Sequence, residues 1–335
     1  MYVKNNKKEG IFLSNLKKFV IALILLVILI PAGAFGYVYF KLNTVYDDNA
    51  DTKLLNKTNY KVEKGITNIL LVGIDARNMH ERSRSDSMMI LTVDNKHKSL
   101  KLTSLARDTY VDIPGHGMQK LTHAYAYGGI KLLVETIENN FKIDLQNYAI
   151  VNFFSFMDIV DALGGVTIDV QKSELNELKK YTQECYDLNT NPKKGSLEFI
   201  TSPGYQKLNG YQTLAYARIR YNDSAMNRDH RQRQIMQALT TSLKNLPITK
   251  YPELVDTILP YIKTNMKPGE IIKLGATVLN IGNFNIKQLE FPVEQYSKGG
   301  IVGKSGWVLQ FDSDKNLPIL NDFIFEDIIY NKPNY

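Results

Sequence analysis

Residues Thr67–Ile74 read TNILLVGI, and this short run organises the rest of the chain around it. The run is almost continuously apolar, which is typical of a strand that is buried on both faces of a sheet. Asp75 follows directly and therefore lies at the carboxyl end of the predicted strand. Such a strand needs neighbouring strands beside it and helices over both faces of the sheet.

The downstream sequence supplies both kinds of element. Ser87–Val93 and Leu100–Leu105 have strand character, and the five residues from Asp94 to Lys98 have turn chemistry, so the sequence predicts a hairpin. Apolar residues at helical spacing predict helices at Leu121–Phe141, Phe156–Leu163, Leu208–Ala217, Asp229–Leu246, Tyr251–Ile258, Pro268–Asn280 and Leu317–Ile328. Further strands are predicted at Tyr148–Phe154, Val166–Val170, Ile286–Phe291 and Trp307–Phe311. The expected fold class is α/β: a central mixed β-sheet with helices on both faces.

Upstream of the predicted sheet, Phe19–Phe40 contains no charged residue and is long enough to cross a hydrocarbon core of about 30 Å as a helix. Five lysines and one glutamate precede it and three aspartates follow it, which favours a cytoplasmic N-terminus. A cleaved secretory signal is the alternative, but the run exceeds the roughly 7–15 apolar residues of a signal. We expect a single-pass cell-membrane protein with a cytoplasmic tail at 1–18, a transmembrane helix at 19–40, an extracellular stalk at 41–64 and an extracellular domain at 65–335.

The net charge and the cysteine content limit the function classes. The chain carries a formal net charge of +7, but without the five lysines and one glutamate of the tail its 41 basic and 34 acidic residues fall to 36 and 33, a net charge of +3. The excess charge is therefore local, and we expect no nucleic-acid partner. Cys185 is the only cysteine, so the exported domain has no internal disulfide and depends on its apolar core.

Arginine and aspartate gather in four places along the chain. Arginine presents a planar fork of donors that matches phosphate oxygens, and carboxylates at strand ends hold divalent cations such as Mg²⁺ against a pyrophosphate. Such groups would neutralise and polarise a phosphoryl group during its transfer. The four clusters are Asp75 with Arg77, Arg82 with Arg84 and Asp86, Arg107 with Asp108, and Arg218 with Arg220, Arg228 and Arg231.

Each cluster also has a purely structural interpretation. The two-residue spacing of Arg218 and Arg220 places both side chains on one face of a strand but on different sides of a helix, and exposed arginines are often simply solvated. Asp75 would also serve as a turn former or helix cap, and Asp108 would serve to orient Arg107. The apolar segment 151–163 is read as core, with the lining of a lipid tunnel as the alternative.

Two further cofactor motifs are rejected. The five histidines lack metal-ligand spacing, so zinc is not expected. The segment Val302–Ser305 has the Gly-Lys-Ser of a P-loop, but Lys298 stands where the first glycine belongs.

Taken together, these motifs resemble the LytR-CpsA-Psr family of Gram-positive cell-envelope ligases. The similarity runs from about Thr67 to Leu246 and follows the family's order of motifs behind a single N-terminal anchor. The motifs in this chain are NILLVGIDAR, RSDSMMILTVD, SLARDTYVDIPGHGMQKLTHAYAYGG, VDALGGVTIDV, QKLNGYQTLAYARIR and NRDHRQRQ.

The resemblance implies a transferase that moves an anionic glycopolymer, such as a wall teichoic acid or capsular polysaccharide, from a polyprenyl-pyrophosphate carrier to the muramic acid C6 hydroxyl of peptidoglycan. Polyprenyl phosphate would be released. Asp75 and Asp86 would bind Mg²⁺, with Mn²⁺ as an alternative ion, and one of them would assist deprotonation of the acceptor. The resemblance assigns the pyrophosphate to Arg84, Arg107, Arg218, Arg220, Arg228, Arg231 and Gln232, with Arg107 also counted as catalytic.

Some positions depart from the family pattern. Ala106 replaces a usual proline, Thr122 replaces a usual asparagine, and Ser224–Asn227 replaces a glycine-rich entry to the last motif. None of these changes removes a charged site residue. Two alternatives remain: a pyrophosphatase that uses water as acceptor, and a non-catalytic scaffold that binds lipids or polymers. The family's older description as transcriptional attenuators fits poorly with an exported domain, and no functional motif is found after Leu246.

Overall fold

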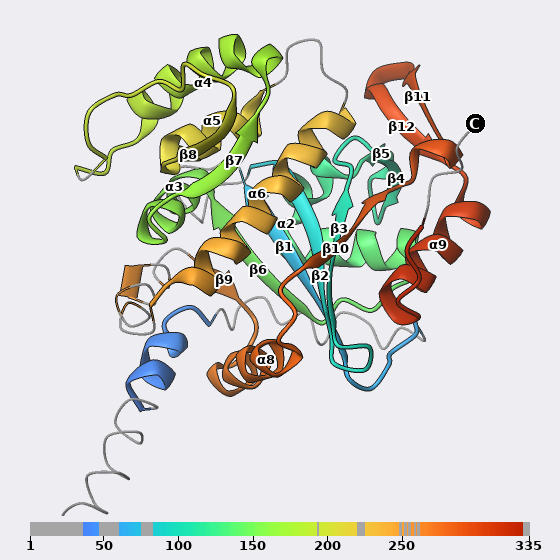
Figure 1. Ribbon diagram of the computed structural model, residues 1–335. Coiled ribbons are helices and arrows are strands. Elements are labelled where there is room, and N and C mark those ends of the chain that lie inside the picture. Colours follow the sequence, from blue (N-terminus) through green and yellow to red (C-terminus); the bar gives the residue numbers. More distant parts are fainter. Residues whose placement is uncertain are drawn as a thin grey trace, which may run out of the picture.

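The computed structural model describes residues 36–46, 60–74, 83–192, 194–219, 225–247, 250, 253, 256–257, 259 and 262–330. Within this part of the chain, the centre of the molecule is a six-stranded sheet in the order β10-β3-β2-β1-β6-β9 (Figure 1). Its strands are β1 (Ile66–Ile74), β2 (Ser85–Asp94), β3 (Ser99–Leu105), β6 (Asn147–Asn152), β9 (Lys263–Thr264) and β10 (Ile286–Phe291). Three two-stranded sheets join β4 (Tyr110–Ile113) to β5 (Gly117–Lys120), β7 (Val166–Val170) to β8 (Gly204–Leu208), and β11 (Ser297–Val302) to β12 (Gly306–Phe311).

The strand directions give the central sheet two different edges. Strand β1 is parallel to β6, and β3 is parallel to β10. Strand β2 runs antiparallel to both β1 and β3, so β1, β3, β6 and β10 all point the same way. We call the edge where these four strands end the carboxyl edge, and the opposite one the amino edge. In open α/β sheets, ligands bind outside the carboxyl ends of the strands.

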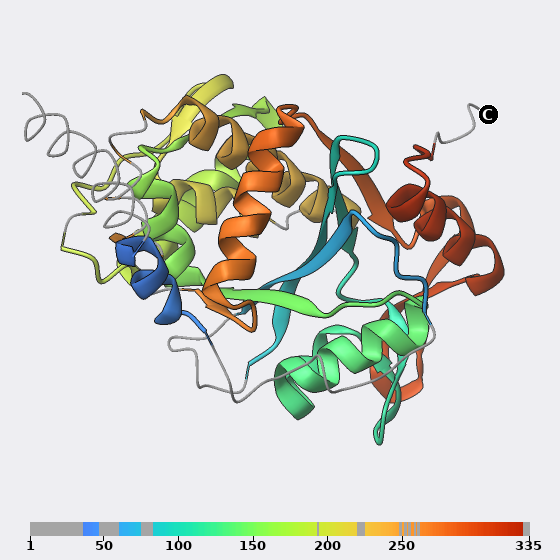
Figure 2. The ribbon, with the colours of Figure 1, turned by 90° about the horizontal axis from the view of Figure 1, so that it is seen from below.

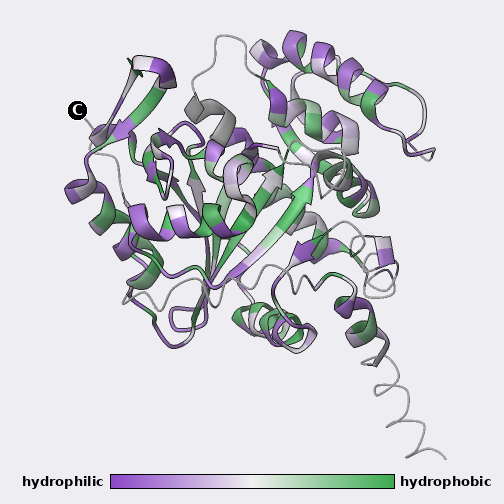
Figure 3. Cartoon of the chain, turned by 180° about the vertical axis from the view of Figure 1, so that it is seen from behind, coloured by the Kyte–Doolittle hydropathy of each residue, from purple (hydrophilic) through white to green (hydrophobic). Residues whose placement is uncertain are grey.

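Helices cover both faces of the sheet, as expected. They are α2 (Thr122–Phe141), α3 (Phe153–Ala162), α4 (Leu175–Leu188), α5 (Gly210–Arg218), α6 (Ala225–Asn245), α8 (Pro268–Ile281) and α9 (Ser313–Phe325). Alternate residues of β1 and β2 belong to a core cluster that also contains buried residues of α2 and α9, whereas Val93 and Leu100 join Ile281 of α8 in another cluster. Figure 2 shows α2 and α8 on opposite sides of the sheet, and Figure 3 shows the apolar strands between them.

A second, smaller core lies beside the sheet, where α3, α4 and α5 pack around β7 and β8. Gly210 at the start of α5 is needed here, since an added Cβ would lie 2.3 Å from the carbonyl oxygen of Met157. The Gly210 N–H donates to Asp161 at 2.7 Å, and Asn209 caps the helix in a capping box with Gln212. The Leu-Asn-Gly-Tyr-Gln motif therefore fixes α5 against α3.

The predicted central elements are confirmed to within a few residues at their ends. The predicted hairpin is formed by β2 and β3, and the strand predicted at Ile286–Phe291 is β10. Helix α4 and strands β4, β5, β8 and β11 were not predicted. Helix α4 is rich in charged and polar residues, and each of these strands has at most six residues. None of them therefore shows a strong apolar pattern in the sequence. The helix predicted at Tyr251–Ile258 falls mostly outside the described residues.

The predicted membrane helix is not shown by the structure. No helix among the described residues is both long and apolar enough to cross a membrane, and residues 1–35, with most of the predicted span, lie outside them. Residues 36–43 form a helix. This helix contacts the domain: the Tyr37 hydroxyl donates to Asp256 at 2.5 Å.

The beginning of the predicted stalk also packs on the domain. Leu42 and Val45 are buried, and the Thr264 N–H donates to the Val45 carbonyl at 3.0 Å. The first residues after the predicted membrane span are therefore part of the folded domain rather than a free connector. The remainder of the predicted stalk up to residue 59 lies outside the described residues.

Candidate phosphate site at the carboxyl edge

Arg107 and Asp86 form the centre of the candidate site. Arg107 lies two residues after the end of β3, and Asp86 is the second residue of β2. Both therefore lie at the carboxyl edge. The Arg107 Nη1 donates to Asp86 Oδ1 at 2.5 Å, and the two side chains are 21% and 18% exposed. Asp108 lies 3.5 Å from Arg107 Nε and 3.1 Å from the Lys120 ammonium. Two carboxylates and two cations thus alternate within a partly buried cluster.

Backbone hydrogen bonds hold the Arg107 loop in place from two sides. The Ala106 N–H donates to the Phe291 carbonyl at the end of β10, and the Thr122 N–H at the start of α2 donates to the Arg107 carbonyl. The Thr122 hydroxyl in turn donates to the Ser85 carbonyl at 2.8 Å. Thr122 therefore ties the start of α2 to both β2 and the Arg107 loop.

Two further cationic side chains, Arg84 and Lys120, belong to the surroundings of the cluster. Burial would lower the pKa of Arg107, but the neighbouring Asp86 and Asp108 outweigh it and raise that pKa. Burial lowers the pKa of His123, and the positive charges of Arg84 and Lys120 lower it further. Both of these cations therefore lie close enough to His123 to act on its charge. The Arg107 Nε is buried and makes no hydrogen bond in the described structure.

Helix α6 reaches the same edge from the other face of the sheet. The Ser87 hydroxyl donates to the Gln232 Oε1 at 2.9 Å, which brings the predicted head-group residue Gln232 next to the strand that carries Asp86. The side chain of Arg228 lies outside the described residues, although its backbone belongs to the first turn of α6. Arg84, Asp86 and Arg107 are therefore the predicted residues that the structure gathers around β2, and Gln232 reaches the same edge from the other face of the sheet.

Arg231 has a different environment from the one predicted. It is 6% exposed, its Nη2 donates to the Ile219 carbonyl at 2.9 Å, and its Nη1 lies 3.2 Å from Glu174. Its guanidinium also lies over the Tyr216 ring. These contacts fasten α6 to α5 and to the segment after β7, a role that needs no pyrophosphate.

Arg218 is placed at the end of helix α5 and not on an extended strand. It lies 3.8 Å from Glu184, and its Nη1 donates to the Cys185 sulfur at 3.5 Å, both on α4. Nothing in these contacts joins Arg218 to the Arg107 cluster. Arg220 and Asp75, which were also predicted to serve the site, lie outside the described residues.

One of the two predicted metal ligands, Asp86, lies among the described residues. Among the described residues, no three histidine, cysteine, aspartate or glutamate side chains come together in a way that could hold a metal. Asp86 supplies one carboxylate, and Mg²⁺ is commonly bound by one or two carboxylates with phosphate oxygens and water. The donor chemistry of Asp86 is therefore compatible with a Mg²⁺ ion that binds together with a pyrophosphate.

Three neighbours of the site were given no role from the sequence: Lys120, His123 and Ser87. His123 and Lys120 lie within the SLARDTYVDIPGHGMQKLTHAYAYGG motif, and Ser87 directly follows Asp86. Their position inside these motifs was the one feature of the sequence that could have indicated a role in the site. Lys120 and His123 reach the site only because α2 and β5 fold back on the Arg107 loop.

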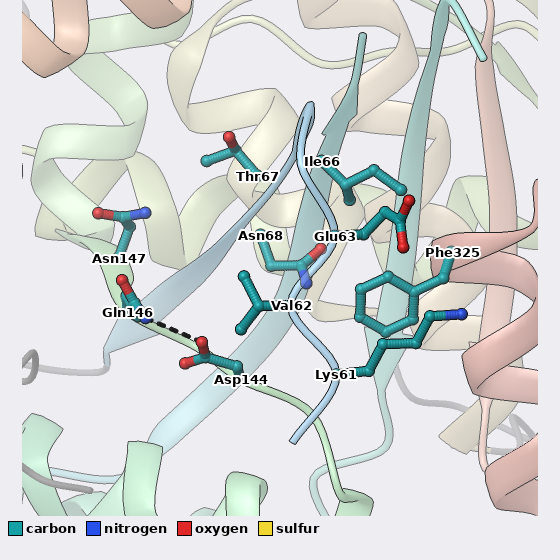
Figure 4. A pocket seen from close by; sticks show the side chains of 10 residues that line it. All are labelled: Lys61, Val62, Glu63, Ile66, Thr67, Asn68, Asp144, Gln146, Asn147 and Phe325. Atoms are coloured by element: carbon teal, nitrogen blue, oxygen red, sulfur yellow. Dashed lines mark hydrogen bonds between the residues drawn. The ribbon is translucent and has the colours of Figure 1, made fainter. Parts of the chain in front are cut away.

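A cavity of about 140 Å³ lies elsewhere, at the amino edge (Figure 4). It is lined by the residues that precede and begin β1 and β6, with Phe325 and Lys61 at one side (Figure 4). Asp144 lies in it and accepts a hydrogen bond from Gln146, and burial raises the pKa of Asp144. The cavity shares no residue with the arginine cluster.

The fold and the site define a class: an α/β domain with arginine and carboxylate side chains placed to hold phosphate at the carboxyl edge of a mixed sheet. The LytR_cpsA_psr family model matches residues 34–319, so this chain belongs to the LytR-CpsA-Psr family. The chain is 31% identical over 302 residues to the polyisoprenyl-teichoic acid–peptidoglycan teichoic acid transferase TagT of Bacillus subtilis, covering 86% of this chain and 89% of TagT. It is 32% identical over 267 residues to the regulatory protein MsrR of Staphylococcus aureus, covering 78% and 76% of the two chains. The solved structure of TagT bound to LI-WTA has 26% sequence identity and a TM-score of 0.66, covering 84% of this chain and 98% of that one.

Proposed function

We propose that this protein transfers an anionic glycopolymer, of the wall teichoic acid or capsular type, from a polyprenyl-pyrophosphate carrier to the muramic acid C6 hydroxyl of peptidoglycan. The observation that carries the proposal is the Arg107–Asp86 pair at the carboxyl edge, with Arg84 and Lys120 beside it. Family membership and similarity to a teichoic acid transferase over most of both chains support it.

In the proposed reaction, the acceptor hydroxyl oxygen bonds to the sugar-proximal phosphorus. The bond from that phosphorus to the bridging oxygen breaks, and polyprenyl phosphate leaves with the bridging oxygen. The hydroxyl proton passes to a carboxylate, for which Asp86 and Asp75 are the candidates. Charge on the phosphoryl oxygens rises as the bond to the leaving group breaks, and positioned arginines stabilise that charge.

Arg107 has the geometry for this task. Asp86 fixes one end of its guanidinium, so little side-chain freedom is lost when a phosphate oxygen binds the remaining donors. We further propose that Asp86 and Asp75 would hold Mg²⁺, or Mn²⁺, which would add positive charge at the phosphoryl group when bound.

We propose a single-pass cell-membrane location with the N-terminus in the cytoplasm and the domain outside. The uncharged segment Phe19–Phe40 and the five lysines before it support this location. A membrane anchor would keep the protein at the same membrane as a lipid-linked donor.

The test is a transfer assay with the full-length chain in detergent, a lipid-pyrophosphate-linked glycan, an uncrosslinked peptidoglycan oligomer and Mg²⁺, with products identified by mass. We expect a phosphodiester-linked glycan–oligomer conjugate, and we expect Arg107→Ala to lower its rate at least about 100-fold. Lys96→Ala is the matched control, because its exposed ion pair with Glu63 lies near the amino edge.

Other products would contradict the proposal. Free glycan phosphate without conjugate would indicate the pyrophosphatase. Donor binding without any turnover, with the same affinity in wild type and in Arg107→Ala, would indicate the non-catalytic scaffold. Addition of a chelator tests the metal separately: conjugate formation that continues at the same rate would contradict a Mg²⁺ or Mn²⁺ requirement and leave the transferase standing.

A further inference from the structure

The β11–β12 hairpin carries an exposed apolar surface that the proposed reaction has not used. Ile301 is 80% exposed and Trp307 is 45% exposed, and the two residues are direct partners across the hairpin. Large apolar side chains in pairs on a surface mark sites of interaction more often than single ones do. The turn between the strands adds the exposed cation Lys304.

Trp307 is held with its ring across the hairpin. A Cβ added to Gly299 on the opposite strand would lie 2.5 Å from Trp307 Cζ2 and 3.0 Å from Cε2, so the indole lies directly on this glycine. The absence of a side chain at 299 lets one ring face rest on the backbone. A ring that is fixed in this way loses little freedom on binding a ligand.

The base of the hairpin is joined to the candidate site. The Leu309 N–H donates to the Asp108 carbonyl at 2.9 Å, next to Arg107, and Phe311 packs edge-on against Phe141 and Phe291 in the main core. Trp307 stands two residues before Leu309 in β12, toward the hairpin turn, or about 7 Å away at the usual rise of a strand. The indole therefore belongs to the strand that is bonded to the Arg107 loop.

The hairpin lies far from the end where the chain leaves the domain toward its predicted anchor. Figures 1 and 2 both show the helix at residues 36–43 and the β11–β12 hairpin at opposite ends of the molecule. A protein anchored through its N-terminus would present this hairpin away from its own membrane. This placement favours a wall polymer over a lipid as the occupant.

We infer that the β11–β12 hairpin is a stacking platform for the glycan strand of the peptidoglycan acceptor, with the indole of Trp307 packed on a pyranose ring. The C–H bonds on one face of a pyranose are weakly positive and fit the negative face of an indole. Ile301 would extend the apolar contact, and Lys304 would attract the carboxylates of the stem peptides. The inference rests on the proposed function for its choice of acceptor.

Trp307 is the only tryptophan in the chain, so its fluorescence reports on the hairpin alone. The full-length chain in detergent is titrated with uncrosslinked GlcNAc–MurNAc-peptide oligomers of defined length, without donor or metal. We expect a saturable change in tryptophan emission. Emission that changes with protein concentration or with phospholipid vesicles, and not with oligomer, would assign the surface to a second copy of the chain or to a membrane and would overturn the inference.

Kinetics give the second readout. We expect Trp307→Ala to raise the KM for the acceptor about 5- to 10-fold while kcat and the KM for the donor stay unchanged. Trp307→Phe, which keeps a flat ring, should raise it less. The control is Tyr205→Ala, which removes an 80% exposed aromatic ring from β8 and should change neither KM.

The outcomes separate this inference from the proposed function. Arg107→Ala should bind the oligomer with wild-type affinity while it fails to transfer. Saturable binding at Trp307 in a protein that makes no conjugate would leave the platform standing and remove the transferase. Conjugate formation with an unchanged acceptor KM in both Trp307 variants would overturn the platform and leave the transferase standing.

Discussion

The two edges of the central sheet each hold an aspartate paired with a basic side chain, and the two pairs differ in how completely they are enclosed. At the amino edge, the Lys101 ammonium lies 2.6 Å from Asp94 and both side chains are 0% exposed. At the carboxyl edge, Arg107 and Asp86 are about one fifth exposed. The same type of pair thus serves two different purposes.

The enclosed pair has its hydrogen bonds provided within the chain. Lys101 also donates to the Ile324 carbonyl at the end of α9 and lies 3.3 Å from Asp327, and Asp94 accepts from the backbone and ring of His97. The network ties α9 to the sheet. Arg107, by contrast, keeps a buried Nε without a hydrogen bond among the described residues. An enclosed charge pair is costly to break because removing one partner leaves the other buried and unpaired, whereas the partly exposed Arg107–Asp86 pair stays accessible to a ligand.

Breaking the enclosed pair should have the largest effect on stability. Lys101→Met leaves Asp94 buried without its cation, and we expect the free energy of unfolding to fall by about 3–5 kcal/mol. Denaturant unfolding of the full-length protein in detergent measures this change. Arg107→Ala should lower stability by much less, since its partner Asp86 remains accessible to water. Equal losses in the two variants would show that exposure does not separate the two pairs.

The pH dependence sharpens the same contrast. Burial would raise the pKa of Asp94, but the hydrogen bonds from Lys101 and His97 outweigh it and hold that pKa below its usual range. Because the folded-state pKa is depressed, this carboxylate contributes stability that is fully present above about pH 3.9 and is lost as the pH falls through the folded pKa.

In Lys101→Met, burial should dominate and raise the pKa of Asp94 above the unfolded value. Protonation then relieves the unpaired charge, so the stability gap between wild type and variant should shrink as the pH falls from 7 to 4, by about 1.4 kcal/mol for each unit of the raised pKa. Unfolding curves at several pH values provide the measurement. Asp144 and Asp161, whose pKa values are raised mainly by burial, are common to both proteins and cancel in the difference. A gap that is constant with pH would contradict this account of Asp94.

The smallest effect is expected where α6 meets the carboxyl edge. Ser87→Ala removes the hydrogen bond to Gln232, and we expect about 1 kcal/mol or less of lost stability with a several-fold fall in kcat/KM for the donor. Thr240→Ala is the control, because that hydroxyl of α6 donates back to the Met236 carbonyl within the same helix. A similar change in kcat/KM in both variants would mean that the Ser87 contact does not position the site.

The sequence predicted the sheet well because its strands are nearly continuous apolar runs. TNILLVGI, the β2–β3 hairpin and IKQLEF were all placed from local pattern, and helices α2, α6 and α8 from apolar spacing. Helix α4 and the short strands were missed because their side chains face mostly water or a small core, so no strong period appears in the sequence. The pairing of β10 with β3 joins residues almost 190 positions apart and could not be predicted from local pattern.

By itself, the sequence determined the α/β class and the residue types of a phosphate site, because periodicity and charge are local properties of the chain. Tertiary structure decided which of the predicted arginines are gathered at the edge. Arg107 meets Asp86 through the antiparallel pairing of β2 with β3, whereas Arg231 is enclosed by Glu174 and Ile219 from distant segments. Trp307 gave no functional signal in the sequence, and its strand lies next to the candidate site only because Leu309 of β12 bonds back to Asp108 in the Arg107 loop. The physical reason is that burial and hydrogen-bond partners depend on the whole fold, while propensity depends on neighbours along the chain.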